Sequence, residues 1–202
     1  MKLVTKLLVV VSLPAVLIWQ VGYYAMNVSK RTLRVAIERQ SDSQAESLMD
    51  EIDRVVLTHL ANWQAYANGQ VVQNTLKLSN SSFAQLPDMN FYIDEQEKSW
   101  IHATDNEPTD LMIELASNAL SLDLIAWLAK LGSVQGRPVY GEVFVTNAFG
   151  VNAAQSSQTT DFLQSDESWW AKAKLDGIFI GDVERDESSG VEAIDLCIAV
   201  HD

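Results

Sequence analysis

The sequence predicts an α+β fold in which a long N-terminal helix packs on an antiparallel sheet, preceded by one transmembrane helix. Two observations predict the fold class. Residues 139–202 read as strands interrupted by one helix, and residues 27–78 carry apolar side chains at mostly three- and four-residue spacing. A third, the uncharged run at residues 7–26, predicts the membrane helix.

The membrane prediction divides the chain into four parts. Residues 1–6 form a short N-terminus, 7–26 the span, 27–51 a polar helical stalk, and 52–202 the folded domain. Trp19, Tyr23 and Tyr24 lie at one end of the span, where interfacial aromatic residues belong. A cleaved signal peptide is the alternative, although the apolar run is longer than a usual signal sequence and no small-x-small site follows it.

Residues 143–156 predict a β-hairpin, with its turn at residues 147–150. A short helix follows, with Ser165 or Asp166 as its cap, Glu167 in its first turn, and Gly177 as its end. Two more strands are expected around an acidic turn at residues 186–190.

Upstream of the hairpin, the sequence predicts only helices and turns. One long helix should run over residues 27–78 until Ser79–Asn80–Ser81–Ser82 breaks it and caps a short helix ending near Pro87. A second short helix is expected within residues 89–104. Pro108 marks the first turn of the next region, and residues 111–131 predict one amphipathic helix.

Charge excludes some classes of protein. Five of the 14 basic residues and none of the 27 acidic residues lie in residues 1–34, so the rest of the chain is strongly acidic. Nucleic-acid binding is therefore not expected. The single cysteine, Cys197, cannot form an internal disulfide and is expected to be a small buried apolar residue.

No catalytic motif is present in the sequence. It has no Gly-rich phosphate loop, no G-x-S-x-G and no C-x-x-C, and the three histidines lie in separate segments without metal-ligand spacing. Acidic residues alternate from Asp182, but the complete calcium-loop pattern is missing. We therefore expect no catalytic site, metal or cofactor within these 202 residues.

Several motifs in residues 139–202 carry a family resemblance. They are a strand ending F-V-T-N, a turn with Gly150, the run T-T-D-F-L-Q-S-D-E-S-W-W, the strand I-F-I-G-D-V, and D-E-S-S-G followed by A-I-D-L-C-I-A-V. Together they resemble the Cache, or extracytoplasmic PAS-like, sensor domains of bacterial sensor kinases and chemoreceptors.

The resemblance implies a small-ligand-sensing domain outside the cell membrane, with an output module such as a histidine kinase in a two-component system. It also implies that the N-terminal helix packs along the sheet and contributes to a homodimer interface. Family members continue with D-x-x-G and a further strand, so we expect this chain to be a fragment that lacks an edge strand. The excess of basic residues after the span, at Lys30, Arg31, Arg34 and Arg39, conflicts with this orientation by the positive-inside rule.

The sharpest candidate for a ligand site is Trp169–Trp170. Adjacent helical residues point about 100° apart, so one indole can pack on the sheet while the other lines a cavity. That both tryptophans are core anchors is the alternative. Asp182 follows a strand and is placed to select an amine or another hydrogen-bond donor. A turn residue is the alternative reading of Asp182.

The amino-acid-binding branch of the Cache family places R-x-W-Y on this helix and Y-x-D on the next strand. Trp169 and Asp182 fit those motifs, whereas Glu167, Trp170 and Ile180 depart from them. Because the arginine that grips a ligand carboxylate is missing, a cationic or neutral amine suits the site better than an α-amino acid.

Four further residues complete the candidate region. Tyr140, Glu142 and Phe144 alternate and are expected to share one face of the hairpin. Asp161 is expected in a loop over the cavity.

The second hypothesis for function is an anchored ectodomain without a small ligand. It would dimerise through residues 52–76 or bind another protein.

Overall fold

The computed structural model describes residues 3–103, 107–131, 133–134, 136–185 and 192–201, with side chains except at residues 4–6, 9, 134 and 137. The chain divides into two units. We call Met1–Thr58 the stem unit and His59–Asp202 the body unit.

The stem unit is helical throughout its described residues. Helix α1 (Leu3–Ala67) contains Pro14, and its last turns belong to the body unit. The sequence predicted helix for the span at residues 7–26 and for the stalk, and the structure confirms the helix. The predicted span includes Val9, whose side chain lies outside the described set.

Among the described helices, none is by itself long and apolar enough to cross a membrane, whereas α4 and α5, bent by 55° at their junction, reach the required length and composition as a pair.

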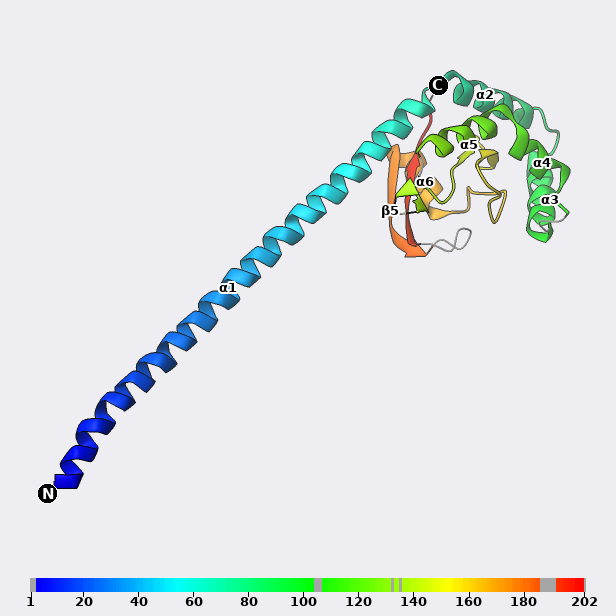
Figure 1. Cartoon of the computed structure of the whole chain (residues 1–202). Coiled ribbons are helices and arrows are strands. Elements are labelled where there is room, and N and C mark those ends of the chain that lie inside the picture. Colours follow the sequence, from blue (N-terminus) through cyan, green and yellow to red (C-terminus); the bar gives the residue numbers. More distant parts are fainter. Residues whose placement is uncertain (1–2, 104–106, 132, 135, 186–191, 202) are drawn as a thin grey trace. The chain divides into compact units, whose positions relative to one another are not determined.

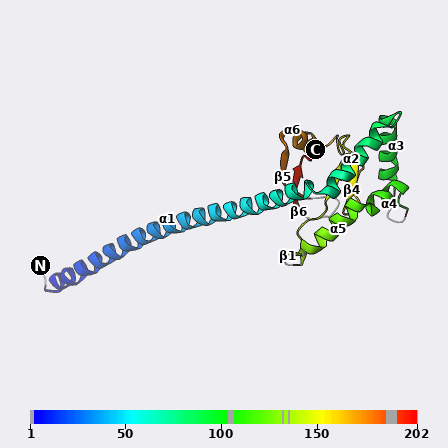
Figure 2. The same cartoon turned by 90° about the horizontal axis from the view of Figure 1, so that it is seen from above.

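The described residues of the body unit form five further helices and three pairs of short strands (Figure 1). The helices are α2 (Gln70–Ala84), α3 (Met89–His102), α4 (Asp110–Ser117), α5 (Ala119–Leu131) and α6 (Ser168–Asp176). The strands are β1 (Ser133–Val134), β2 (Arg137–Pro138), β3 (Phe144–Thr146), β4 (Asn152–Gln155), β5 (Ile178–Arg185) and β6 (Glu192–Ile198). In Figures 1 and 2, α3 and α4 occupy one end of the body, whereas β5 and α6 occupy the other.

The predicted long helix over residues 27–78 is wrong at its C-terminal end. The helix ends at Ala67, and Gly69 adopts an extended conformation (φ −68°, ψ 146°) that starts α2. The predicted break at Ser79–Ser82 lies inside α2. There, Ser79 Oγ accepts from Asn147 Nδ2 at 3.1 Å, and Asn80 Oδ1 accepts from the Ala148 N–H at 2.8 Å. The polar run therefore clamps the hairpin turn and leaves the helix intact.

The single helix predicted over residues 111–131 is two helices. Asn118 separates them: its Oδ1 accepts from the Ser121 N–H at 2.9 Å, and its Nδ2 donates to the Ala153 carbonyl at 2.9 Å. The first bond caps α5, and the second ties the bend to β4. The prediction of Pro108 in the first turn of α4 is also wrong, because Thr109 is the N-cap and accepts from the Met112 N–H.

The predicted hairpin is confirmed. Strands β3 and β4 pair antiparallel with Phe144 opposite Gln155, and Gly150 takes φ 79° in the turn. Strands β5 and β6 also pair antiparallel, and the acidic turn predicted between them lies outside the described residues. The described strands form three two-stranded sheets, so the α+β class is confirmed and one continuous PAS-like sheet is not shown.

Two apolar clusters flank β4. The first joins α2 and α5 to β4 and comprises Val72, Leu76, Leu120, Leu124, Ala153 and Ala154. The second joins α3 and α4 to the residues around the hairpin and comprises Ile93, Trp100, Met112, Leu115, Val151 and Phe162. Both clusters reach the same five-residue stretch, Val151 to Gln155, which is buried along its whole length.

Gly150 is predicted to be intolerant of a side chain. A Cβ at this position overlaps Ser165 Cβ, and the left-handed backbone adds strain. We expect Gly150→Ala to cost about 3 kcal/mol or more. Gly177→Ala is the matched control: it shares a positive φ of 84° but has open space around its Cβ, and should cost only about 1–2 kcal/mol. Urea unfolding of the full chain measures both, and equal losses would contradict the role of Ser165.

Candidate functional site

The two tryptophans predicted to line a ligand site both contact β3. Trp169 packs edge-to-face on Phe144, with ring centroids 5.8 Å apart and an interplanar angle of 69°. Trp170 Nε1 donates to Thr146 Oγ1 at 3.1 Å. Since Phe144 and Thr146 alternate on one strand, the two indoles reach one face of β3 from neighbouring positions on α6. We call Phe144, Trp169 and Trp170 the aromatic patch.

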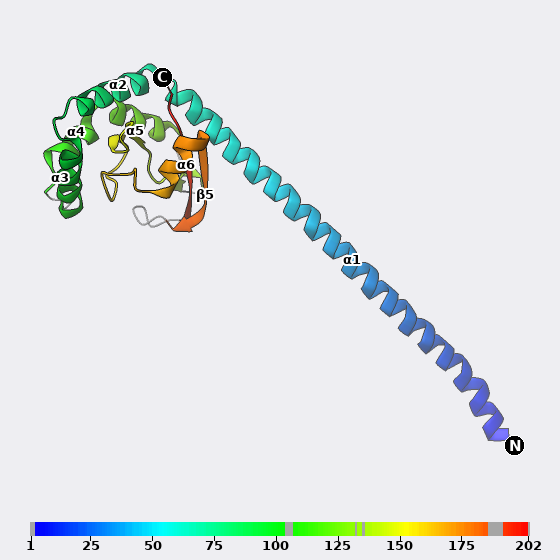
Figure 3. The same ribbon diagram turned by 180° about the vertical axis from the view of Figure 1, so that it is seen from behind.

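The start and end of α6 set the positions of these indoles. The predicted caps, Ser165 and Asp166, are wrong: Glu167 occupies the N-cap position, without a side-chain bond to the helix. Gly177 ends the helix as predicted, in the left-handed conformation with its N–H on the Ala173 carbonyl at 2.9 Å. Figure 3 shows α6 lying against β5, which begins at the next residue.

Lysine side chains of α6 cover two aromatic rings. Lys174 Nζ lies 4.4 Å from the centroid of the Trp170 ring, and Lys172 Nζ lies 4.9 Å from that of Phe179. All three members of the patch are half-buried, so their rings are partly accessible, and the Lys174 ammonium lies beside one of them. The patch therefore offers flat apolar walls with a neighbouring positive charge. The four-residue spacing of Trp170 and Lys174 was the sequence signal for this contact.

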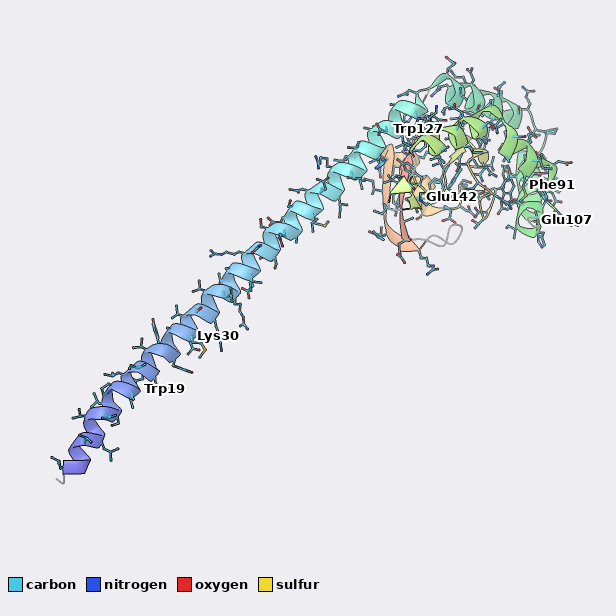
Figure 4. All side chains as sticks on the ribbon, in the orientation of Figure 1. Trp19, Lys30, Phe91, Glu107, Trp127 and Glu142 are labelled. Carbon is cyan, nitrogen blue, oxygen red and sulfur yellow. The ribbon has the colours of Figure 1, made fainter. Side chains whose placement is uncertain are left out.

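Tyr140 lies in a different cluster. Its hydroxyl is hydrogen-bonded to His59 Nδ1, and its ring is 5.3 Å from Trp63, edge-to-face. Trp63 is in turn 4.6 Å from Trp127, which Figure 4 marks on α5. The predicted common face of Tyr140, Glu142 and Phe144 is not formed, because β3 begins only at Phe144.

Tyr66 closes this second aromatic cluster. Its hydroxyl donates to Asp123 Oδ2 at 2.7 Å, and its ring is 5.3 Å from Trp127. Burial and the neighbouring Asp123 carboxylate raise the pKa of the Tyr66 phenol well above its ordinary value. Tyr66 is therefore neutral and a donor throughout the physiological range, so the cluster serves to join α1 to α5.

Asp161 belongs to a hydrogen-bonded loop between β4 and α6. Its carbonyl accepts from Asn152 Nδ2 at 3.0 Å and from Thr159 Oγ1 at 2.6 Å, and its carboxylate accepts from Gln164 Nε2 at 2.7 Å. These bonds fix the loop's conformation, and none of them reaches the aromatic patch. Asp161 is thus brought together with Asn152 and Gln164, apart from Trp169.

Glu97 anchors the same loop from α3, and no sequence signal marked it. Its Oε2 accepts from the N–H groups of Phe162 and Leu163 at 2.9 and 2.8 Å. Next to these bonds, the Trp100 indole N–H donates to the Thr159 carbonyl at 2.9 Å, and its ring stacks on Phe162 at 5.6 Å. Residues from one face of α3 therefore hold the loop that leads into α6.

Asp182, the last predicted site residue, is exposed on β5. It lies at the shift in register between Ile180 and Val183, opposite β6. The described residues include no group of three His, Cys, Asp or Glu side chains placed to hold a metal ion.

Two open hollows lie elsewhere on the body unit. One, of about 420 Å³, lies where α2 meets α3, beside Phe149. The other, of about 340 Å³, lies between α4, α5 and residues 155–158. Gln155 lines the second hollow and is 2% exposed, and its Oε1 has no hydrogen-bond partner among the described residues. Neither hollow is lined by the aromatic patch.

Comparison with known proteins gave no match: none of the family models, curated proteins or solved structures searched resembles this chain significantly.

Glu97 is expected to make stability depend on pH. Desolvation raises the pKa of its carboxyl above the ordinary 4.5, opposed by the amides of Leu163 and Phe162 and supported by the charges of Asp161 and Asp166. The folded state thus prefers the protonated form. The contribution of protonated Glu97 to folding stability is complete below pH 4.5 and is lost as the pH rises through the raised pKa of its carboxyl.

Two substitutions test this contribution. Glu97→Gln should gain stability relative to wild type as the pH rises from 4 to 8, because the amide cannot ionise but still accepts. Glu97→Ala leaves both N–H groups without an acceptor and should cost about 1–3 kcal/mol for each at every pH. Glu95→Gln, which removes an exposed carboxylate of the same helix, is the control. Parallel pH profiles for wild type and Glu97→Gln in urea unfolding would refute the assignment.

Proposed function

We propose that this chain is the small-ligand-sensing part of a membrane-anchored signalling receptor, with the ligand bound at the aromatic patch. One observation carries the proposal. Phe144 on the hairpin and Trp169 and Trp170 on α6 are distant in sequence, yet they meet in the body unit and keep part of their ring surface accessible. Half-buried aromatic rings with few polar groups are typical of small-molecule sites.

The charge beside the patch favours an anionic ligand with a flat apolar part. The Lys174 ammonium lies over the Trp170 ring, so a cationic ligand would meet like charge there. A carboxylate or phosphate would instead pair with it. The R-x-W-Y motif provides its positive charge through an arginine, which this chain lacks. In this proposal Lys174 provides the positive charge instead. The amine ligand expected from the sequence becomes the competing hypothesis.

The membrane anchor in this proposal is residues 7–26, which include no charged residue. The large apolar side chains described there are exposed along α1, among them Leu13, Ile18 and Trp19. Trp19 stacks on Tyr23 with centroids 5.7 Å apart, and Figure 4 marks Trp19 on the helix. A run of this length fits the hydrocarbon thickness of a bilayer, and aromatic pairs of this kind suit its interface. The resemblance to Cache domains supports a body unit outside a bacterial inner membrane and a kinase-type output.

A thermal-shift panel on the full chain tests the ligand site. A ligand that binds only the native state at 100 times its Kd stabilises by about 2.7 kcal/mol, which raises the Tm by roughly 5–10 °C in a chain of this size. We expect such shifts from aromatic carboxylates and not from aromatic amines. Trp169→Leu should abolish the shift and Lys174→Gln should reduce it.

Trp127→Leu is the matched control, because it removes an indole from the other aromatic cluster. Should Trp169→Leu fail to fold, Trp170→Phe keeps an aromatic ring but removes the rest of the indole, including the N–H on Thr146 Oγ1, and still tests the patch. A shift that survives Trp169→Leu and Trp170→Phe would place the ligand elsewhere. Shifts from amines alone would reverse the proposed charge preference.

A dimerisation module is the second candidate, and exposed apolar residues of the stem unit favour it. The predicted interface covers residues 52–76, but three of its apolar residues are buried in the chain's own fold and cannot contact a second copy: Leu60, Val72 and Leu76. Large apolar residues remain exposed earlier on α1. At 100° per residue, five of them fall within an arc of about 100°: Leu33, Ile37, Leu48, Ile52 and Val55.

We call these five residues the apolar stripe. Analytical ultracentrifugation of the full chain in detergent tests whether the stripe is a dimer interface. We expect Leu48→Gln with Ile52→Gln to weaken self-association by roughly 100-fold or more, since each loses apolar burial in both copies. Val35→Gln with Met49→Gln is the control, because these exposed residues point away from the stripe. A monomeric wild type, or equal effects of the two pairs, would contradict dimerisation by this face.

A further inference from the structure

Three basic residues follow the apolar run of α1 within little more than two helical turns. Lys30, Arg31 and Arg34 are all exposed, and Figure 4 marks Lys30 on the helix. The first acidic residue of the chain is Glu38. We call Lys30, Arg31 and Arg34 the basic collar.

Helical geometry places the collar at a defined depth. At 1.5 Å per residue, Lys30 and Arg31 lie about 6–8 Å beyond Met26, and Arg34 lies about 12 Å beyond it. The headgroup layer on each side of a bilayer is about 5–8 Å thick. Long basic side chains also extend toward the interface from either side. With residues 7–26 in the hydrocarbon, the three charged groups therefore reach the phosphate level.

The collar is also directional around the helix. At 100° per residue, its three members fall within an arc of about 100°. Arg39 lies outside that arc, next to Glu38 and close to Asp42, so the unbalanced positive charge ends with Arg34.

We infer that the basic collar binds the headgroups of anionic phospholipids. The inference rests on the proposed membrane anchor and goes beyond the proposed ligand site. Nucleic acids and acidic proteins carry the complementary charge too, but the adjoining apolar segment brings these side chains to lipid phosphates. Headgroup binding also accounts for an excess of basic residues on the side where the body unit begins, independently of which leaflet that is.

Lipid association measured by electron paramagnetic resonance tests the inference. The full chain is reconstituted in phosphatidylcholine vesicles with a small fraction of spin-labelled phosphatidylglycerol or phosphatidylcholine, and the motionally restricted fraction of each is compared. We expect wild type to prefer phosphatidylglycerol by about fivefold, the scale of one basic side chain at a membrane surface. The preference should fall steeply in 1 M NaCl, where the Debye length is about 3 Å.

Variants assign the effect to the collar. Lys30→Gln with Arg31→Gln and Arg34→Gln should remove most of the preference, and the conservative Arg31→Lys with Arg34→Lys should keep it. Lys98→Gln with Lys130→Gln and Arg185→Gln, an equal change of charge in the body unit, should leave it unchanged. Lys2→Gln with Lys6→Gln measures how much of the preference for phosphatidylglycerol comes from the basic residues at the other end of the span.

Two failures are distinguishable. Release of the chain from vesicles by alkaline carbonate would refute the anchor and, with it, the lipid contact. An integral wild-type chain that shows no preference for phosphatidylglycerol, or one whose preference is insensitive to salt, would refute the collar and leave the anchor intact. Should the triple glutamine variant fail to insert, the salt dependence of the wild type still decides between these outcomes.

Discussion

The body unit depends on the burial of the five residues Val151 to Gln155, because both apolar clusters meet there. Strand β4 pairs with β3 on one side only, so its other edge must find partners away from water. Side chains supply them. Asn118 Nδ2 donates to the Ala153 carbonyl, and Ser121 Oγ accepts from the Gln155 N–H at 2.9 Å. The bend between α4 and α5 is what brings Asn118 and Ser121 to this edge.

The remaining backbone partners come from the loop before α6. The Asn152 N–H donates to the Phe162 carbonyl at 3.0 Å, and the Gln164 N–H donates to the Gly150 carbonyl at 2.7 Å. Glu97 and Trp100 fix this loop from the outside. Since the loop leads directly into α6, its anchoring determines where Trp169 and Trp170 contact β3. The aromatic patch is thus positioned by a hydrogen-bonded loop that contributes no residue to it.

The parts of the fold that local sequence determines were predictable. Gly150 and Gly177 mark positions that need a positive φ, so the hairpin turn and the end of α6 followed from residue type. The helix break at Gly69, the bend at Asn118 and the uninterrupted α2 were missed. At Asn118 and at Ser79 and Asn80 a polar residue finds a tertiary partner, and an apolar periodicity carries no information about such partners. The break at Gly69 is local, because its N–H bonds the Tyr66 carbonyl and a glycine inside a helical pattern was its sequence signal. Ser79 and Asn80 look like a break until the hairpin turn lies against them.

The residues of the candidate site also differ in whether local sequence could predict their positions. The pairing of Trp169 with Phe144 was within reach of the sequence, because both lie on elements that residue patterns define. The position of Tyr140 was not, since the strand starts later than its alternation suggests. Glu97 was invisible, because a lone glutamate on a polar helix face has the same pattern whether or not two amides bind it.

Tyr140 also connects the patch to the last turns of α1 within the body unit. It contacts His59 and Trp63 on that helix, and it lies only four positions before Phe144 in the chain. A ligand on the patch that shifts β3 would therefore also act on Tyr140 and its contacts with α1. Aromatic contacts at 4.6–5.3 Å among Trp63, Trp127 and Tyr140 resist such a shift, because close-packed rings have few alternative arrangements. A ligand can bias this connection only by the difference in its affinity for two packings of these rings, and a ligand that binds both packings equally tightly shifts nothing.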